Sequence, residues 1–95
     1  MYSITKGAIL GLTLPMARDL GRFNIRVVTL VPGIFETPMG SNISPKVIEA
    51  MNKMTPMGRP GHPKEFALFV ESVIRNSYLN GTNLRLDGAI KLGYM

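Results

Sequence analysis

The sequence predicts an α/β fold with parallel strands, on three observations. A helical period of apolar residues covers positions 3–20, and a β-branched, almost continuously apolar run follows at 25–31. After a loop rich in proline and glycine, a second helical period begins near Pro63 and a short strand covers 82–86. The order helix, strand, loop, helix, strand contains one βαβ unit, whose two strands run parallel.

The first helix carries an apolar stripe in which residues recur every four positions, and we expect that face to be buried. Pro15 lies inside the helix, where it removes the hydrogen bond to the Gly11 carbonyl and predicts a kink rather than a break. Gly21 follows as a stop signal. The stripe consists of Ile4, Ala8, Leu12, Met16 and Leu20.

The first strand ends at Pro32–Gly33, and its apolar character suits a strand that is covered on both faces. Residues 32–62 are loop-like, with a short helix predicted from position 44 or 45 to position 53. The second long helix begins with proline at its first position, Glu65 in its first turn and His62 as an imperfect cap. Its predicted buried face carries Phe66, Phe69, Val70, Val73 and Ile74.

The composition, with 45% hydrophobic and 18% charged residues, is that of one small globular domain, taken as residues 1–95. Two parallel strands leave two open edges, so we expect the chain to be incomplete and poorly stable alone. No apolar run approaches the ~20 residues of a membrane span, and the absence of cysteine excludes a disulfide framework. The formal net charge of +5 leaves a basic nucleic-acid-binding module as a minor alternative, but the lysines and arginines are scattered.

Tyr2 and Lys6 stand four positions apart at the start of the first helix, so their side chains share one face about one turn apart. A tyrosine that works as an acid or base near neutral pH must lose most of its ordinary pKa of ~10. A lysine ammonium ~4 Å away contributes on the order of 4 kcal/mol at an effective dielectric of ~20, enough to lower that pKa by roughly three. The pair predicts a catalytic acid/base with its activator, although the spacing alone also fits two surface side chains.

The motifs beyond this pair follow in a fixed order. Tyr2–Ala8 (YSITKGA) opens the helix, and Pro32–Pro38 (PGIFETP), Gly58–Glu65 (GRPGHPKE) and Leu86–Gly88 (LDG) follow. The series resembles the second half of the short-chain dehydrogenase/reductase family over essentially the whole chain. A narrower likeness, to the branch that acts on 3-hydroxyacyl-CoA thioesters or hydroxysteroids, is carried by Thr13–Leu20, Pro32–Phe35, Leu79–Gly81 and Arg85–Ile90.

This resemblance implies the C-terminal part of a Rossmann-like, doubly wound parallel sheet. The other half of such a protein is expected to carry the Gly-rich dinucleotide turn, the acidic residue that selects NAD over NADP, and the catalytic serine. Tyr2 would exchange a proton with the substrate oxygen, and Lys6 would lower the pKa of Tyr2 and bind the nicotinamide ribose. The residues implied to contact the cofactor are Tyr2, Lys6, Pro32, Gly33, Ile34, Phe35 and Thr37.

The substrate loop would span residues 39–62, where Met39, Met51, Met54 and Met57 could form an adaptable apolar cover for an acyl chain. Without the resemblance, these methionines fit an irregular segment equally well, and Phe35 would more often be a core residue. Asp87–Gly88 matches the closing motif of the family and is expected to be structural.

The activity implied is NAD-dependent oxidation of a secondary alcohol, with a 3-hydroxyacyl-CoA as first substrate and a hydroxysteroid as second. The resemblance further implies a homo-oligomer, usually a tetramer, in the mitochondrion, with the cytoplasm as the alternative. No metal, nucleic acid or membrane partner is expected. The rival interpretation is a catalytically silent segment that serves as a subunit or binds a partner, because the active site within this chain is incomplete.

Overall fold

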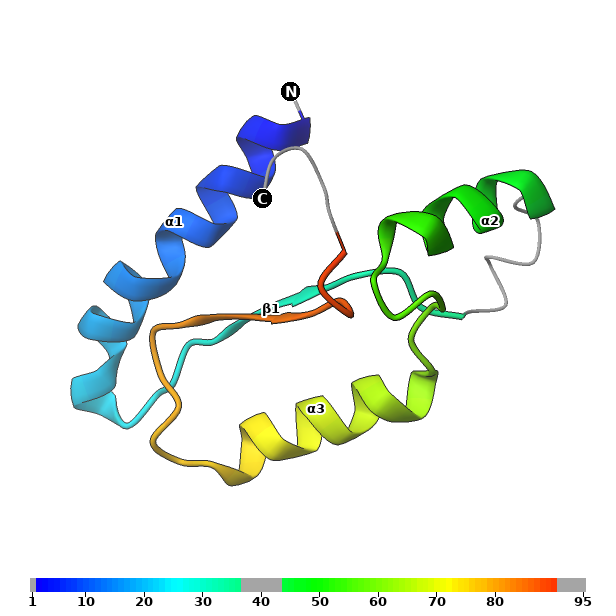
Figure 1. The fold of residues 1–95 in the computed structure, drawn as a ribbon. Coiled ribbons are helices and arrows are strands. Elements are labelled where there is room, and N and C mark those ends of the chain that lie inside the picture. The colour runs from blue at the N-terminus through cyan, green and yellow to red at the C-terminus, as the bar shows by residue number, and fades with distance from the viewer. Residues whose placement is uncertain (1, 37–43, 91–95) are drawn as a thin grey trace.

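The computed structural model describes residues 2–36 and 44–90, and the side chains of residues 2–4 and 6 lie outside that description. Helices α1 and α3 lie on opposite faces of a two-stranded parallel sheet, and α2 lies beyond the carboxyl ends of its strands (Figure 1). This arrangement confirms the predicted α/β class and order of elements. The elements are α1 (Tyr2–Leu20), a short 3-10 helix η1 (Gly21–Phe23), β1 (Thr29–Pro32), α2 (Pro45–Met54), α3 (Pro63–Arg75) and β2 (Asn83–Leu86).

The two strands pair in parallel from Thr29 opposite Asn83 to Pro32 opposite Leu86. The first strand therefore begins at Thr29, four residues later than the predicted position 25. Ahead of β1, the backbone of Val27 pairs with the Asn80–Gly81 turn and not with a neighbouring strand. The Val27 N–H donates to the side-chain oxygen of Asn80 at 2.9 Å. The Val27 carbonyl also accepts the N–H of Gly81, the residue after Asn80, at 2.8 Å.

The helices begin and end close to their predicted positions. α1 continues through Pro15 without a break, and the first turn of α2 is capped by Ser44, whose hydroxyl accepts the N–H of Lys46 at 3.3 Å. α3 begins with Pro63 at its first position, as predicted.

Arg26 lies at the C-terminal end of α3, where its guanidinium donates to four carbonyl oxygens. Its positive charge and its N–H groups match the negative end and the unpaired carbonyls of a helix C-terminus. These carbonyls belong to Val73 at 2.9 Å, Ile74 at 2.9 Å, Asn76 at 3.1 Å and Leu79 at 3.2 Å.

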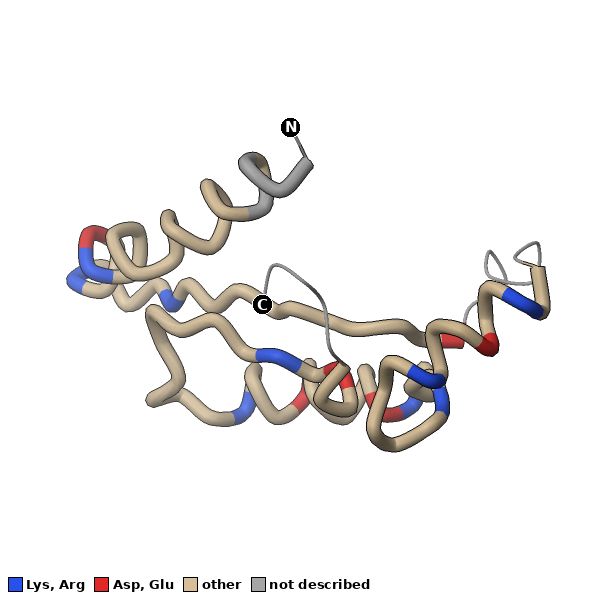
Figure 2. The backbone as a smooth tube through the Cα atoms, turned by 45° about the horizontal axis from the view of Figure 1, so that its top comes forward, with Lys and Arg blue, Asp and Glu red and all other residues tan. Residues whose placement is uncertain are grey.

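Basic and acidic residues are interspersed along the described chain and are not gathered in one segment (Figure 2). Exposed ion pairs join Lys53 to Glu49 at 3.9 Å and Arg75 to Glu71 at 2.8 Å, both one helical turn apart. A continuous basic surface, the feature that a nucleic-acid-binding module needs, is therefore not visible on the part of the chain that the structure describes.

The described residues form a very thin core. Ala17 and Ile90 are the only apolar residues among them that are buried, at 4% and 2% exposure. The buried hydroxyl of Thr13 forms a hydrogen bond of 2.5 Å with that of Thr29 and so joins α1 to β1. The radius of gyration, 15.4 Å, exceeds the ~12 Å expected of a compact domain of this length. The prediction that the chain is incomplete on its own agrees with these features.

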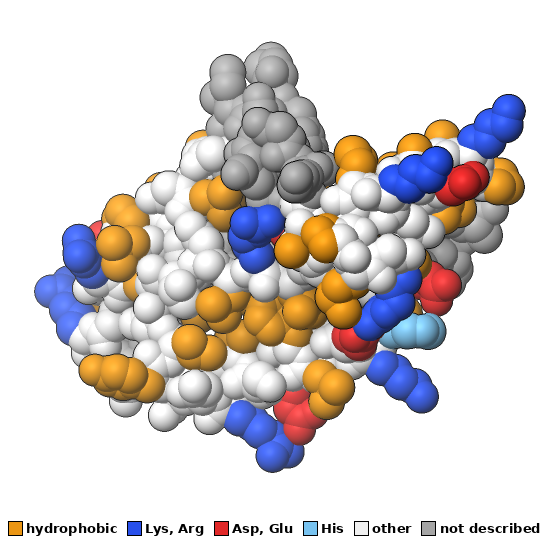
Figure 3. All heavy atoms as spheres, in the orientation of Figure 1, with side chains coloured by type: hydrophobic (Ala, Val, Ile, Leu, Met, Phe, Trp, Pro, Cys, Tyr) orange, Lys and Arg blue, Asp and Glu red, His pale blue; other side chains and the backbone are white. Residues whose placement is uncertain are grey.

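The prediction that the apolar stripe of α1 is buried is wrong for Ala8, Leu12 and Met16, which are exposed. Leu20 is half-buried, and the side chain of Ile4 lies outside the described part of the chain. Leu12 and Met16 are 54% and 43% exposed, and Ile9 on the same side is 49% exposed. A sheet of two strands covers only a narrow strip of the helix, and that strip contains Thr13 and Ala17. On α3, Phe66, Phe69, Val70 and Val73 are half-buried as predicted, whereas Ile74 is exposed. Apolar side chains are accordingly spread over the face shown in Figure 3, including a band across its middle.

Candidate active site

The loop that follows β1 crosses the carboxyl end of β2. The N–H of Gly33 donates to the carbonyl of Leu86 at 2.9 Å. A Cβ atom on Gly33 would lie 2.5 Å from the Cβ of Asp87, closer than the 3.0 Å that real Cβ atoms respect. Glycine is therefore required where the chain leaves β1.

Phe35 is held by the segment that precedes α3. The N–H of Gly61 donates to the carbonyl of Ile34 at 2.8 Å, and the N–H of Glu36 donates to the carbonyl of Gly61 at 2.9 Å, which makes an isolated parallel bridge. A Cβ on Gly61 would overlap the Phe35 ring. The same ring packs edge-on against Phe66 with the centroids 5.6 Å apart. The loop after β1 is thus fixed relative to α3.

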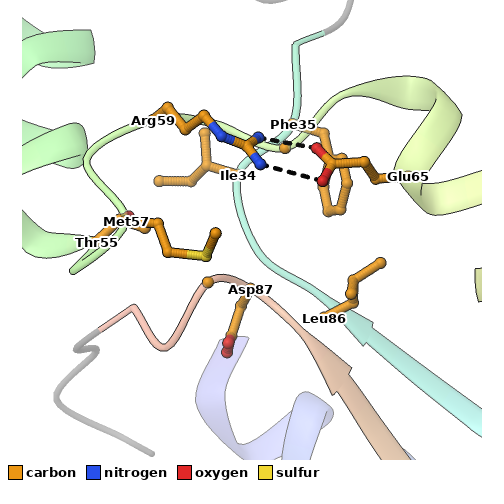
Figure 4. Close-up of a pocket in the computed structure, with 10 residues that line it drawn as sticks. Ile34, Phe35, Thr55, Met57, Arg59, Glu65, Leu86 and Asp87 are labelled. Carbon is orange, nitrogen blue, oxygen red and sulfur yellow. Dashed lines mark hydrogen bonds and ion pairs between the residues drawn. The ribbon is translucent and has the colours of Figure 1, made fainter.

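A cavity of about 90 Å³ lies at the carboxyl ends of both strands (Figure 4). In open parallel sheets this is the end at which ligands bind. Ile34 and Phe35, two residues of the predicted cofactor loop, line the cavity, and Asp87 and Gly88 line it from the end of β2. The remaining lining residues are Thr55, Met57, Arg59, Gly61, Glu65 and Leu86.

An ion pair with two hydrogen bonds stands at the rim of this cavity. Arg59 donates to the two carboxylate oxygens of Glu65 at 2.8 and 3.1 Å, and the backbone N–H of His62 donates to the same carboxylate at 2.8 Å. The Arg59 hydrogen bonds, followed by that from His62, lower the pKa of Glu65 to about 2, and the carboxylate raises the pKa of Arg59. Both groups stay charged near neutral pH, so the pair positions the segment before α3 and does not exchange protons.

Asp87 fixes the turn after β2. Its carboxylate is only 7% exposed and accepts from Arg85 at 2.9 and 2.7 Å and from the N–H of Ala89 at 3.0 Å. This last contact stabilises a turn in which Gly88 and Ala89 both have positive φ, at 62° and 66°. These partners belong to β2 and to the turn that follows it, so we interpret Asp87 as structural.

Tyr2 and Lys6 both lie in the first turns of α1, four positions apart on one face of the helix. α1 runs from the carboxyl end of the sheet back toward the start of β1, so its first turns lie at the same end of the sheet as the loop after β1 (Figure 1). The side chains of Tyr2 and Lys6 are outside the described part of the chain, as are Thr37 and Met39 entirely.

The predicted substrate residues Met51 and Met54 lie in α2; the first is half-buried and the second is 43% exposed. The methionine that lines the cavity is Met57, next to the turn at Gly88. Met57 is one of the methionines that the sequence suggested as an apolar cover. Sequence reasoning missed Arg59, and the signal that could have found it is its position six residues before the helix-starting Glu65, within reach of the N-terminus of that helix.

Within residues 2–36 and 44–90, no group of three His, Cys, Asp or Glu could hold a metal ion. No helix in this same part is long and apolar enough to cross a membrane.

Comparison with known proteins defines the class. A family model described as enoyl-(acyl carrier protein) reductase matches residues 1–90. With the βαβ architecture and the loop motif at Gly33, this match shows that the chain belongs to the short-chain dehydrogenase/reductase family and corresponds to its C-terminal region.

Particular relatives are similar over nearly the whole chain. It is 47% identical to 3-hydroxyacyl-CoA dehydrogenase type-2 of Bos taurus and 46% identical to that of Homo sapiens, over 96% of the chain and 35% of each relative. The crystal structure of 3-hydroxyacyl-CoA dehydrogenase type-2 from Mycobacterium avium superposes with a TM-score of 0.89 at 35% identity, over 99% of this chain and 37% of that one. The narrower resemblance is thereby confirmed, and the chain spans about a third of the length of these relatives.

Proposed function

We propose that this chain supplies the C-terminal part of the active site of an NAD-dependent oxidoreductase that interconverts a secondary alcohol and a ketone. A 3-hydroxyacyl-CoA is the first substrate and a hydroxysteroid the second. The observation that carries the proposal is the 46–47% identity over 96% of the chain to relatives named for 3-hydroxyacyl-CoA dehydrogenation. The choice of NAD over NADP rests on this resemblance alone.

The loop after β1 fits the nicotinamide end of such a cofactor. Gly33 presents no side chain where the backbone turns past Asp87, and Ile34 and Phe35 line the cavity at the carboxyl end of the sheet. Their apolar surfaces suit an aromatic ring, and the Phe35 ring is held in place by Phe66. We assign Pro32, Gly33, Ile34, Phe35 and Thr37 to this role.

The proton is handled by Tyr2 and Lys6. In the oxidative direction, the phenolate of Tyr2 takes the proton of the substrate hydroxyl, and in the reductive direction the phenol returns it. The ammonium of Lys6 keeps the pKa of Tyr2 low enough for this exchange and binds the nicotinamide ribose. NAD, when bound, supplies the hydride acceptor. Met39, Met51, Met54 and Met57 would cover the acyl chain, and of these Met57 lines the cavity.

We also propose that the protein is a homo-oligomer, a tetramer on the family pattern. This proposal rests on the resemblance alone. A mitochondrial location is proposed on the resemblance alone.

The activity can be tested in a chimera in which this chain replaces the matching third of the bovine relative. Purified chimera is incubated with NAD and either a 3-hydroxyacyl-CoA or a hydroxysteroid, and NADH formation is followed by absorbance, with the unmodified bovine protein as control. Turnover of the CoA thioester at a higher kcat/KM than the steroid supports the proposal. A chimera that melts like the control and binds NADH but turns over neither substrate refutes it.

A further inference from the structure

The backbone N–H and C=O of Val27, just ahead of β1, are both hydrogen-bonded to the Asn80–Gly81 dipeptide. Its N–H donates to the side-chain oxygen of Asn80 at 2.9 Å, and its carbonyl accepts the N–H of Gly81 at 2.8 Å. Gly81 has a φ of +69°, and a Cβ at this position would come within 3.0 Å of Leu14 and 3.2 Å of Ala17. The fold therefore requires glycine at this position and uses the amide side chain that precedes it.

The same dipeptide is the most reactive asparagine sequence in the chain. Of the six asparagines, Asn80 alone precedes glycine, and a following residue without a side chain leaves its backbone nitrogen free to approach the asparagine side chain. Asparagine is among the chemically labile residues of proteins. The Asn80–Gly81 dipeptide that closes the turn is therefore also chemically labile.

We propose that Asn80 is a deamidation site whose reaction is suppressed by the two hydrogen bonds to Val27. In the reaction the Gly81 nitrogen loses its proton and attacks Cγ of Asn80, the new C–N bond forms, and Nδ2 leaves as ammonia. Water then opens the cyclic imide at either carbonyl and gives aspartate or isoaspartate. In the fold the Gly81 proton is held by the Val27 carbonyl, and the Asn80 side chain is held by the Val27 N–H.

Reaction therefore requires that this turn opens locally. Arg26 stabilises the closed form, because its guanidinium donates to the carbonyl of Leu79, the residue before Asn80, as well as to the end of α3. Isoaspartate lengthens the backbone by one methylene three residues before β2 begins at Asn83. The modification is expected to prevent the turn from closing again onto Val27.

The experiment compares the chimera with the bovine relative in buffer, the same chimera in urea, and a synthetic peptide of residues 76–86, all at pH 7.4 and 37 °C. Peptide mapping by mass spectrometry measures the gain of mass at each asparagine, and an isoaspartate-specific methyltransferase identifies the product. In urea and in the peptide, Asn80 should react faster than every other asparagine of this chain that is present. In buffer its rate should be at least about tenfold lower, because only the locally open fraction reacts.

Arg26→Ala should raise the rate in buffer severalfold and leave the rate in urea unchanged. Arg75→Ala, at the end of the same helix but in an exposed pair with Glu71, is the matched control and should leave both rates unchanged. Equal rates in buffer, urea and peptide would overturn the proposed protection. A slower reaction at Asn80 than at Asn76 in urea would overturn the assignment of the site.

Discussion

Glu65 accepts three hydrogen bonds within its own neighbourhood, two of them from Arg59 and one from the backbone N–H of His62. The carboxylate thereby caps the first turn of α3 and ties it to the segment that bears Gly61, the residue packed against the Phe35 ring. The geometry of the proposed cofactor loop thus depends on a charged pair beside the cavity.

The dependence of stability on pH tests this pair. The pKa of Glu65 is about 2 in the folded chain, below the ~4.3 of an unfolded chain, so the unfolded chain takes up the proton first as the pH falls. The stabilisation is complete above the unfolded pKa and is lost progressively as the pH falls toward 2. In the chimera, the difference in Tm between the parent and its Glu65→Gln variant should shrink over this window.

The control for this titration is Glu49→Gln, which removes an exposed partner of Lys53 at 3.9 Å and should give a small Tm difference. Because the Glu65 side chain is 43% exposed, added salt should weaken its effect as well. A pKa for Glu65 near 4.3, measured by carbon NMR of the carboxyl group, would contradict the structure.

Gly33→Ala tests the crossing of the loop over β2. The new Cβ would lie 2.5 Å from that of Asp87, so either the loop or the β2 turn must move. We expect a loss of roughly 1–3 kcal/mol in unfolding free energy, as for other overpacked sites. Gly11→Ala is the matched control, because nothing lies within 4 Å of its Cβ and alanine favours a helix by about 0.5–1 kcal/mol. Urea denaturation of both chimeras measures the difference, and equal midpoints would refute the packing argument.

The exposed apolar face of α1 predicts how the 95-residue chain behaves alone. With Leu12 54% and Ile9 49% exposed and both sheet edges open, we expect it to associate or precipitate at micromolar concentration. Size-exclusion chromatography with light scattering measures the mass, and the double change Leu12→Lys with Met16→Glu should shift it toward the monomer. A monodisperse parent chain with a cooperative thermal transition would contradict this expectation.

The local parts of this fold could be predicted from the sequence, because their causes are local. Pro63 and Glu65 define the start of α3, and Pro32–Gly33 ends β1. Parallel pairing followed from the alternation of helices and strands. The motif order also identified the family.

The rest depends on residues far apart in the chain. Arg26 caps α3 through carbonyls 47 to 53 positions away, and no periodic rule predicts such a partner. Burial of the α1 stripe was predicted wrongly because a pattern shows which face is apolar and not how much sheet lies opposite it. At the candidate site, Ile34 and Phe35 line the cavity, and their contact with a cofactor stays a prediction. Arg59 was missed although its partner Glu65 is only six residues away, because the segment between them is irregular and follows no periodic rule.

The central claim is that Tyr2 carries the proton in catalysis and that Lys6 activates it. In the chimera, Tyr2→Phe removes the proton donor with little change in volume, so kcat should fall by at least ~100-fold, within the range of acid/base groups, while NADH binding stays nearly intact. Lys6→Met should weaken NADH binding and move the alkaline limb of any residual pH–rate profile upward. The loss of kcat in the double variant should be much smaller than the product of the losses in the two single variants, because the two residues act as one unit.

Tyr78→Phe is the matched control, since this tyrosine is 96% exposed and the same hydroxyl is removed. The most direct measurement is the kcat of the Tyr2→Phe and Tyr78→Phe chimeras, side by side with the parent at saturating NAD and 3-hydroxyacyl-CoA. We predict a loss of at least ~100-fold for the first and a parental rate for the second. A parental rate for the Tyr2→Phe chimera would contradict the catalytic assignment.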